Sequence, residues 1–339
     1  MMLLQDMKTI PWRYISQILF TVLVLWIGIE FFLFVHQLES GQPVTIRRPP
    51  GVEAFLPIAS LMSLRYWLAT GIFTPIHPSG LVIFMVILTI AIFLKKAFCS
   101  WVCPIGFLSE MLARVQKWIF GQSRYLPRWL DWPLRSLKYL LLGFFLWAIL
   151  VQMDIAGIAA FLESPYSRVS DIKMLKFFTD MSPLTARVLA GLFLLSILIP
   201  YFWCRYLCPY GALLGGLSWL SPLKIRRNAA SCTDCKKCTK VCPSNIPVHL
   251  KNTVYSDECH ACLTCVAACP VKNTLDFSTS KPSLKLDSLR VVMVILCLFL
   301  GSSLLARALG VWHNDITVQE YREHVRKMSD GLEYSHPGR

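Results

Sequence analysis

The stretch FCSWVCPIGF, residues 98–107, closely follows an apolar run at 81–93 that has the composition of a membrane helix. It places two cysteines four residues apart, with a proline immediately after the second. Residues four apart share one face of a helix, and helical geometry is disfavoured at the residue before a proline. The stretch therefore predicts a helix that ends at a pair of thiols, where the chain turns away.

The same pattern occurs a second time. WCRYLCPYGA, residues 203–212, also follows an apolar run and shares the spacing C-x3-C-P-x-G. Each half of the chain has an outward apolar segment, an external segment with aromatic and proline residues, an inward apolar segment and then the motif. Such repeats usually pack about a pseudo-symmetry axis along the membrane normal. The internal two-fold repeat therefore predicts that four thiols meet at the cytoplasmic membrane edge: Cys99, Cys103, Cys204 and Cys208.

These helix-end thiols have three alternative roles. They could jointly hold a further iron–sulfur cluster. They could instead form a redox-active thiol pair or a metal-ion handling site. They could also be packed as small hydrophobic side chains, as buried free cysteines often are. The duplication of the motif favours a functional role.

The composition is that of a membrane protein. Of the 339 residues 55% are hydrophobic and 16% are charged, and the mean hydropathy is +0.52. The net charge of +14 would suggest nucleic acid in a soluble protein, but Lys and Arg collect in the cytoplasmic loops of membrane proteins, so no nucleic-acid partner is expected. Five apolar stretches approach the length needed to cross a bilayer: 15–36, 80–98, 134–153, 186–203 and 290–309.

The basic residues predict the orientation. The connections 95–138 and 204–290 are rich in Lys and Arg, whereas 37–79 and 154–185 hold three each. The N-terminus and both basic connections are therefore expected in the cytoplasm of a bacterial inner-membrane protein, and five spans place the C-terminus in the periplasm. Most of the thirteen cysteines then lie on the reducing side, which favours metal ligation over disulfides.

Two ferredoxin-type runs carry the most specific signal. CTDCKKCTKVCP at 232–243 and CHACLTCVAACP at 259–270 both have the spacing C-x2-C-x2-C-x3-C-P. In two-cluster ferredoxins the fourth cysteine of each run ligates the other cluster. The spacing predicts two [4Fe–4S] clusters, one held by Cys232, Cys235, Cys238 and Cys269 and the other by Cys259, Cys262, Cys265 and Cys242. Zinc is the alternative, but it prefers two separated C-x2-C pairs.

With these motifs, residues 14–309 resemble the membrane polyferredoxins. These include the NapH-type quinol dehydrogenase subunit of periplasmic nitrate reduction and the membrane part of NosR, and the CcoG (FixG-like) assembly proteins share the layout. The resemblance implies electron transfer between the quinone pool, or a cytoplasmic donor, and a periplasmic or membrane-bound respiratory reductase. CcoG implies an alternative, an assembly factor that reduces a metal ion while another enzyme matures.

The expected fold is an all-α polytopic membrane protein, surrounded by lipid, with an inserted cytoplasmic α+β ferredoxin module. The expected divisions are a first membrane repeat, a second membrane repeat, the two-cluster module, a fifth transmembrane helix and an external tail: 1–133, 134–222, 223–285, 286–310 and 311–339. A short helix is expected in the tail, beginning at the capping box T-V-Q-E from Thr317 to Glu320.

A quinol site is a weaker inference. Glu30 lies inside the first apolar stretch, where an ionisable residue is costly and suggests a function. His36 and His77 are expected near the outer face, where a carboxylate and an imidazole could accept the protons of a quinol. Alternatively, Glu30 bonds a neighbouring helix and the histidines line external loops. The sequence indicates no other catalytic residues, because in this class the protein supplies ligation, spacing and electrostatics.

Overall fold

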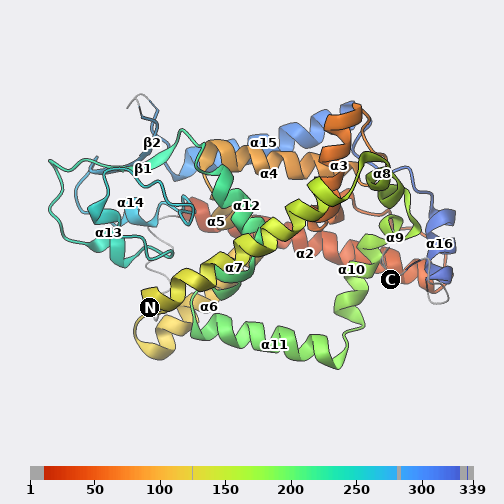
Figure 1. Ribbon diagram of the computed structural model, residues 1–339, viewed down its shortest axis with the longest axis horizontal. Helices are drawn as coiled ribbons and strands as arrows, with labels where there is room; N and C mark the ends of the chain where they lie inside the picture. The colour runs from red at the N-terminus through yellow and green to blue at the C-terminus, as the bar shows by residue number, and fades with distance from the viewer. Residues whose placement is uncertain (1–10, 124, 281–283, 329–333, 335–339) are drawn as a thin grey trace. The chain divides into compact units, whose positions relative to one another are not determined.

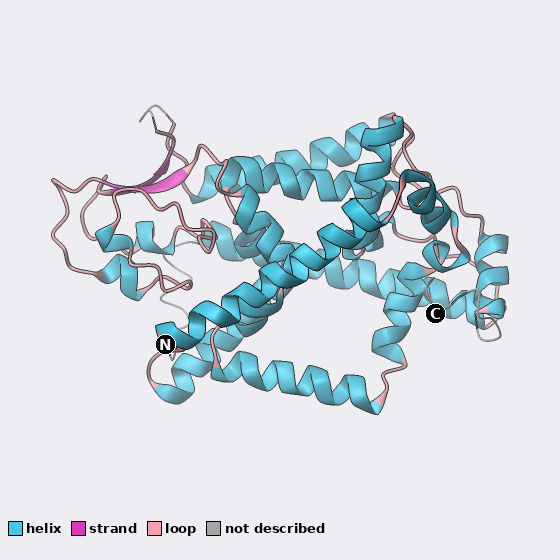
Figure 2. Cartoon of the chain, in the orientation of Figure 1, coloured by secondary structure: helices cyan, strands magenta, loops and turns pink. Residues whose placement is uncertain are grey.

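The computed structural model describes residues 11–123, 125–280, 284–328 and 334, and these are mostly helical (Figure 2). The helices are α2 (Pro11–Glu39), α3 (Pro57–Thr70), α4 (Pro78–Leu94), α5 (Ala97–Trp101), α6 (Pro104–Phe120), α7 (Arg128–Trp147), α8 (Ile155–Glu163), α9 (Pro165–Arg168), α10 (Ser170–Thr179), α11 (Pro183–Leu198), α12 (Pro209–Leu217), α13 (Lys237–Lys240), α14 (Thr264–Ala267), α15 (Ser288–Ala308) and α16 (Val318–Lys327). Short helical turns are η1 (Pro50–Phe55), η2 (Ala148–Gln152), η3 (Trp203–Leu207) and η4 (Val248–Leu250).

Three helices of the described chain are long and apolar enough to cross a membrane: α2, α7 together with η2, and α15. They match three of the five expected spans. The expected span at 80–98 corresponds to α4, which has only 17 residues, about 25 Å of helix. The expected span at 186–203 corresponds to α11, which passes the same test only together with α10, across a bend of 79°. The chain is therefore a membrane protein, while the number of five spans stays a prediction.

Two compact units make up the chain. Unit 1 comprises residues 1–22, 87–142 and 187–298, and unit 2 comprises 23–86, 143–186 and 299–339. The limits of the units fall inside α2, α4, α7, α11 and α15, so neither unit is one half of the sequence repeat. Both C-x3-C-P motifs and both ferredoxin runs belong to unit 1.

In unit 2 the tail helix packs against its own chain. Thr317 caps α16 by accepting a hydrogen bond from the backbone N–H of Glu320 at 3.2 Å, which confirms the predicted start of the tail helix. The next turn inserts the buried Tyr321 edge-on against Phe34 of α2, with ring centroids 5.7 Å apart. Arg168 forms an ion pair with Glu320. The described part of the tail thus contributes to the core of unit 2.

In unit 1 the two ferredoxin runs are held by a strand pair. β1 (Lys224–Arg227) and β2 (Leu275–Ser278) are antiparallel, with Lys224 opposite Ser278, and α13 and α14 lie beside them (Figure 1). The residues on both sides of the second cysteine adopt left-handed backbone in each run. They are Asp234 and Lys236 in the first run and Ala261 and Leu263 in the second. The repeated spacing therefore folds into two loops of the same local geometry.

Each C-x3-C-P motif forms a turn between two helical segments. Cys99 lies in α5 and Cys204 in η3, whereas Cys103 and Cys208 are the capping residues of α6 and α12. The helical turn ends before the second cysteine, as the proline rule predicts. The proline has a second effect that the sequence prediction did not include, because its fixed φ also suits the first position of the next helix.

Candidate functional site

Eight cysteines line two small cavities in the ferredoxin module. Cavity A is lined by Cys232, Cys235, Cys238 and Cys269. Cavity B is lined by Cys242, Cys259, Cys262 and Cys265. Each cavity combines three cysteines of one run with the last cysteine of the other run, which is the division expected from the spacing. The donor set is all thiol, as [4Fe–4S] clusters require.

The type and number of donors around each cavity fit a [4Fe–4S] cluster, which takes one thiolate at each of its four irons. Across the described residues, no three His, Cys, Asp or Glu side chains converge closely enough to hold one metal ion. A cubane cluster has no such requirement, because each of its four irons takes one thiolate at a separate corner. The residues around cavities A and B therefore fit [4Fe–4S] clusters, although actual ligation stays a prediction.

The two cavities differ in burial. Cys259, Cys262 and Cys265 of cavity B are all buried, whereas Cys235 of cavity A is exposed. Solvent exposure and nearby charge are among the factors that set the potential of an iron–sulfur cluster. The two sites therefore offer unequal surroundings to otherwise identical ligand sets.

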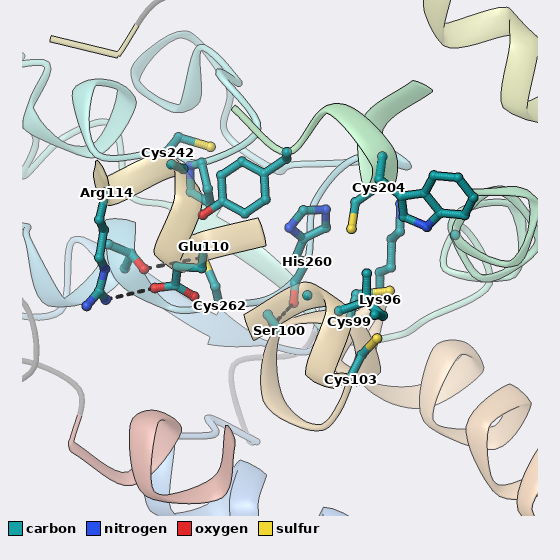
Figure 3. Close-up of a pocket in the computed structure, with 18 of the residues that line it drawn as sticks. Lys96, Cys99, Ser100, Cys103, Glu110, Arg114, Cys204, Cys242, His260 and Cys262 are labelled. Carbon is teal, nitrogen blue, oxygen red and sulfur yellow. Dashed lines mark hydrogen bonds and ion pairs between the residues drawn. The ribbon is translucent and has the colours of Figure 1, made fainter. Parts of the chain in front are cut away.

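A third cavity contains all four helix-end thiols. Its volume is about 310 Å³, and Cys99, Cys103, Cys204 and Cys208 all line it (Figure 3). Ser109 of α6, from the first half, lies 3.4 Å from the sulfur of Cys204, from the second half. The structure thus brings the two thiol pairs together, as the repeat led us to expect. We call this space the helix-end cavity.

The helix-end cavity and cavity B share a wall. Cys242, Pro243, His260 and Cys262 line both of them. In Figure 3, His260 lies between Cys242 and Cys262 on one side and the helix-end thiols on the other. Burial, followed by the charge of Lys96, lowers the pKa of His260 to about 3, so this imidazole is neutral at physiological pH. None of the four shared residues lines cavity A.

The helix-end thiols are strongly desolvated. Burial raises the pKa of Cys99 well above its ordinary value, that of Cys103 to about 11 and that of Cys204 to about 12. The amide of Gly211, in the first turn of α12, donates to the sulfur of Cys208 at 3.2 Å. Since the thiolate is the form that ligates metal, loading of this cavity needs positive charge to compensate the lost protons.

Side chains at the helix ends dock the ferredoxin module through its backbone carbonyls. Ser100 Oγ donates to the carbonyl of His260 at 2.7 Å, and Trp101 Nε1 donates to that of Ala261 at 3.0 Å. Lys95 Nζ donates to the carbonyls of Val254 at 3.1 Å and Ser256 at 3.2 Å. These donors occupy or flank the first thiol turn, so the turn and the wall of cavity B are fixed against each other.

Buried ion pairs strengthen this docking. Lys138 of α7 pairs with Glu258, which directly precedes the second ferredoxin run. Arg205, next to Cys204, binds Asp131 and donates to the carbonyl of Ser244 at 3.2 Å. Glu110 binds both Arg13 and Arg114 in the same way. None of these acids was among the residues predicted to have a role. Carboxylates are few in the basic connections 95–138 and 204–290, and that rarity is the feature of the sequence that could have drawn attention to them.

The three proposed quinol residues have different surroundings in the described structure. His36 is exposed and stacks on Phe32, and Glu30 is half-buried within α2. His77 is buried, and its Nε2 donates to the carbonyl of Ser167 at 2.8 Å. Among the described residues, no hydrogen bond or ion pair joins Glu30 to either histidine. The roles of these three residues stay predictions.

His77 belongs instead to a buried charged network in unit 2. Its Nδ1 lies 3.8 Å from Glu53, a carboxylate that is fully buried. Arg48 bridges Glu53 at 2.9 Å and Asp171 at 2.7 Å. Burial alone would raise the pKa of Glu53, but Arg48 and the hydrogen bonds hold it at about 2. Glu53 is therefore a permanent negative charge rather than a proton carrier.

Comparison with known proteins agrees with this geometry. A family described as a 4Fe-4S binding domain matches residues 76–122 and again 183–228, so each match contains one C-x3-C-P motif. A family described as a 4Fe-4S dicluster domain matches residues 224–270, which hold both ferredoxin runs. No solved structure matches the chain.

Several curated proteins are similar over much of the chain. The "Putative electron transport protein YccM" of Escherichia coli is 44% identical over 320 residues, which are 93% of this chain and 89% of YccM. The "Ferredoxin-type protein NapH" of Haemophilus influenzae is 28% identical, over 58% of this chain and 66% of NapH. The "Regulatory protein NosR" of Pseudomonas aeruginosa is 27% identical, over 50% of this chain and 23% of NosR. This chain therefore belongs, with YccM, to the family of membrane-bound 4Fe–4S polyferredoxins of the NapH/NosR type.

Proposed function

We propose that this electron-transport protein carries electrons along three redox sites in a fixed order: cavity A, cavity B and the helix-end cavity. The observation that carries the proposal is the wall of Cys242, Pro243, His260 and Cys262, which cavity B shares with the helix-end cavity. The exposed Cys235 supports an end position for cavity A, where a cytoplasmic partner has access. The protein's task in this scheme is to fix the spacing and the surroundings of the sites.

Twelve cysteines would divide into three ligand sets. The two groups of four ferredoxin cysteines would hold one [4Fe–4S] cluster each, and the four helix-end cysteines would hold a third. A bound cluster supplies one-electron chemistry at a potential that its surroundings set. Trp101, Ser100 and Lys95 hold the module carbonyls and keep the wall in place. The burial of cavity B keeps water away from its thiols.

We further propose that the two ends of this route are the quinone pool or a cytoplasmic donor, and a respiratory or periplasmic reductase. The relatives named NapH and NosR support this assignment. The test is anaerobic reduction of the loaded protein by a short-chain quinol, followed by EPR. Quinol-dependent signals from the clusters are expected. Reduction by dithionite but not by quinol would leave the cytoplasmic donor as the source and remove quinol from the scheme.

Ligand division can be tested with a matched pair of variants. Cys242→Ser is expected to abolish the EPR signal of the cluster at cavity B and to leave that of cavity A, although Cys242 belongs to the first run in sequence. Cys269→Ser is expected to do the reverse. The reason is that each substitution removes one thiol from the cavity it lines. If each variant instead damages the cluster of its own run, the division is wrong.

Orientation is part of the proposal. Five spans in the inner membrane, with the N-terminus and the ferredoxin module in the cytoplasm, are supported by the basic connections and by the length of α15. Reporter fusions after Lys285 and after Gly310 flank α15 and are expected to report opposite sides of the membrane. Activity of a cytoplasmic reporter at both positions would remove α15 from the spans and place the tail inside.

A further inference from the structure

Lys96 is a buried lysine without a hydrogen-bond partner. Its side chain is 1% exposed, and its Nζ has no partner within the described structure. The preceding residue, Lys95, follows the end of α4 and has left-handed backbone with a φ of 58°. Lys95 bonds module carbonyls, whereas Lys96 lines the helix-end cavity (Figure 3). A buried ammonium without partners costs several kcal/mol unless an opposite charge compensates it.

The carboxylates near Lys96 are each bound to another group. Glu258 acts on it electrostatically but already forms an ion pair with Lys138. Asp257 also acts on Lys96 and accepts a hydrogen bond from Tyr139. Glu110 is the one carboxylate that lines the cavity, and it is shared by Arg13 and Arg114. The remaining groups that act on Lys96 with opposite charge are Cys99 and Cys208, once their thiols are ionised.

We infer that the helix-end cavity is built for an occupant of net negative charge, with Lys96 as its counter-charge. A cluster ligated by four thiolates is such an occupant, because the four ligand charges exceed those of its irons and sulfides together. A cuprous ion bound by two thiolates has a net charge of −1, compared with −2 for the cluster in its oxidised state, so the ammonium favours the cluster more strongly than the single ion. This inference rests on the proposed role of the cavity, and it gives Lys96 two effects, on the choice of occupant and on its potential.

The test compares three variants with the wild-type protein. Lys96→Met removes the charge and keeps the length of the side chain, and Lys96→Arg keeps the charge. Lys176→Met is the control for loss of a lysine charge, because Lys176 pairs with Glu39 in unit 2 and lines none of the three cavities. Iron content and redox titration by EPR are measured on anaerobically purified protein. The signals of the two ferredoxin clusters serve as the check that each variant is folded.

Lys96→Met is expected to lower the midpoint potential of the helix-end centre, because the reduced and more negative state loses its counter-charge. It is also expected to lower the iron content toward that of the two ferredoxin clusters alone. Lys96→Arg and Lys176→Met are expected to keep both values for that centre. An unchanged midpoint potential and iron content in Lys96→Met would overturn the inference. If that variant lacks the ferredoxin signals, Lys96→Gln replaces it in the same comparison.

A second arm uses cuprous ion alone, added to protein without its iron in competition with a chromogenic chelator. Lys96→Met is expected to bind it more weakly at the helix-end thiols than the wild-type protein does, because the thiolates that hold the ion lose their counter-charge. Equal or stronger binding by Lys96→Met would overturn the inference. This arm also separates two failures. If the wild-type protein holds no third cluster, the proposed function loses that site, while weaker copper binding by Lys96→Met would still support Lys96 as a counter-charge.

Discussion

Replacing Cys204 by serine is expected to remove about four of about twelve iron atoms per chain and to leave both ferredoxin clusters intact. The physical reason is that Cys204 lines the helix-end cavity but neither cavity A nor cavity B. The same loss is expected for serine at Cys99, Cys103 or Cys208, since a hydroxyl replaces one thiolate of the same set. Electron flow between the ferredoxin clusters and the external partner is expected to slow with it.

Cys297→Ser is the matched control for this loss. Cys297 is an exposed cysteine of α15 that lines none of these three cavities. The iron content and electron flow of the Cys297→Ser variant are therefore expected to equal those of the wild-type protein. The measurement is iron and sulfide counting on anaerobic protein, with Mössbauer or EPR spectra to assign what remains. A wild-type content of about eight irons would eliminate the third cluster and leave a thiol pair as the working site. Unchanged electron flow after all four helix-end cysteines are replaced by serine would leave these cysteines only a packing role.

The sequence predicted which thiols meet, because that information is local and repeated. Two copies of C-x3-C-P at the ends of apolar segments imply equivalent positions, and two ferredoxin runs carry their ligand spacing within twelve residues each. The helix N-cap at Thr317 is local in the same sense, because its hydrogen bond closes within three residues. For the proline after Cys103, the sequence predicted the end of the preceding helical turn. It did not predict the helix that begins at this proline, because that follows from a separate preference of proline for the first helical position.

Contacts between distant segments could not be read from the sequence. Lys138 and Glu258 are 120 residues apart, and their pairing depends on how α7 meets the ferredoxin module. Lys96 looked like one of many cytoplasmic basic residues, and its burial became visible only with the helix-end cavity around it. The contacts of His77 could not be read from the sequence either. His77 was grouped with Glu30 because an imidazole and a carboxylate could accept the protons of a quinol, whereas the structure gives His77 a neighbouring carboxylate in the buried Glu53.

The glycine of each C-x3-C-P-x-G motif leads to a second prediction, in which the two copies behave differently. Gly106 and Gly211 are both the third residue of a helix that a cysteine caps. A β-carbon at Gly106 would overlap the carbonyl oxygen of Cys99, which is backbone and cannot swing aside. At Gly211 the nearest atoms would be the sulfur of Cys208 at 3.5 Å and the carbonyl oxygen of Cys204 at 3.6 Å, which are ordinary contacts.

Gly106→Ala is therefore expected to push the α5 turn away from α6, to displace Cys99 from the other thiols, and to cost about 1–3 kcal/mol of stability or more. Iron beyond that of the two ferredoxin clusters should be lost. Gly211→Ala is expected to keep that iron and to change stability by less than about 1 kcal/mol, because alanine favours the helix. Iron content and the midpoint of thermal unfolding in detergent check both variants. Equal iron in the two would mean that the close approach of Gly106 to Cys99 does not shape the helix-end cavity, and that the shared glycine reflects helix packing alone.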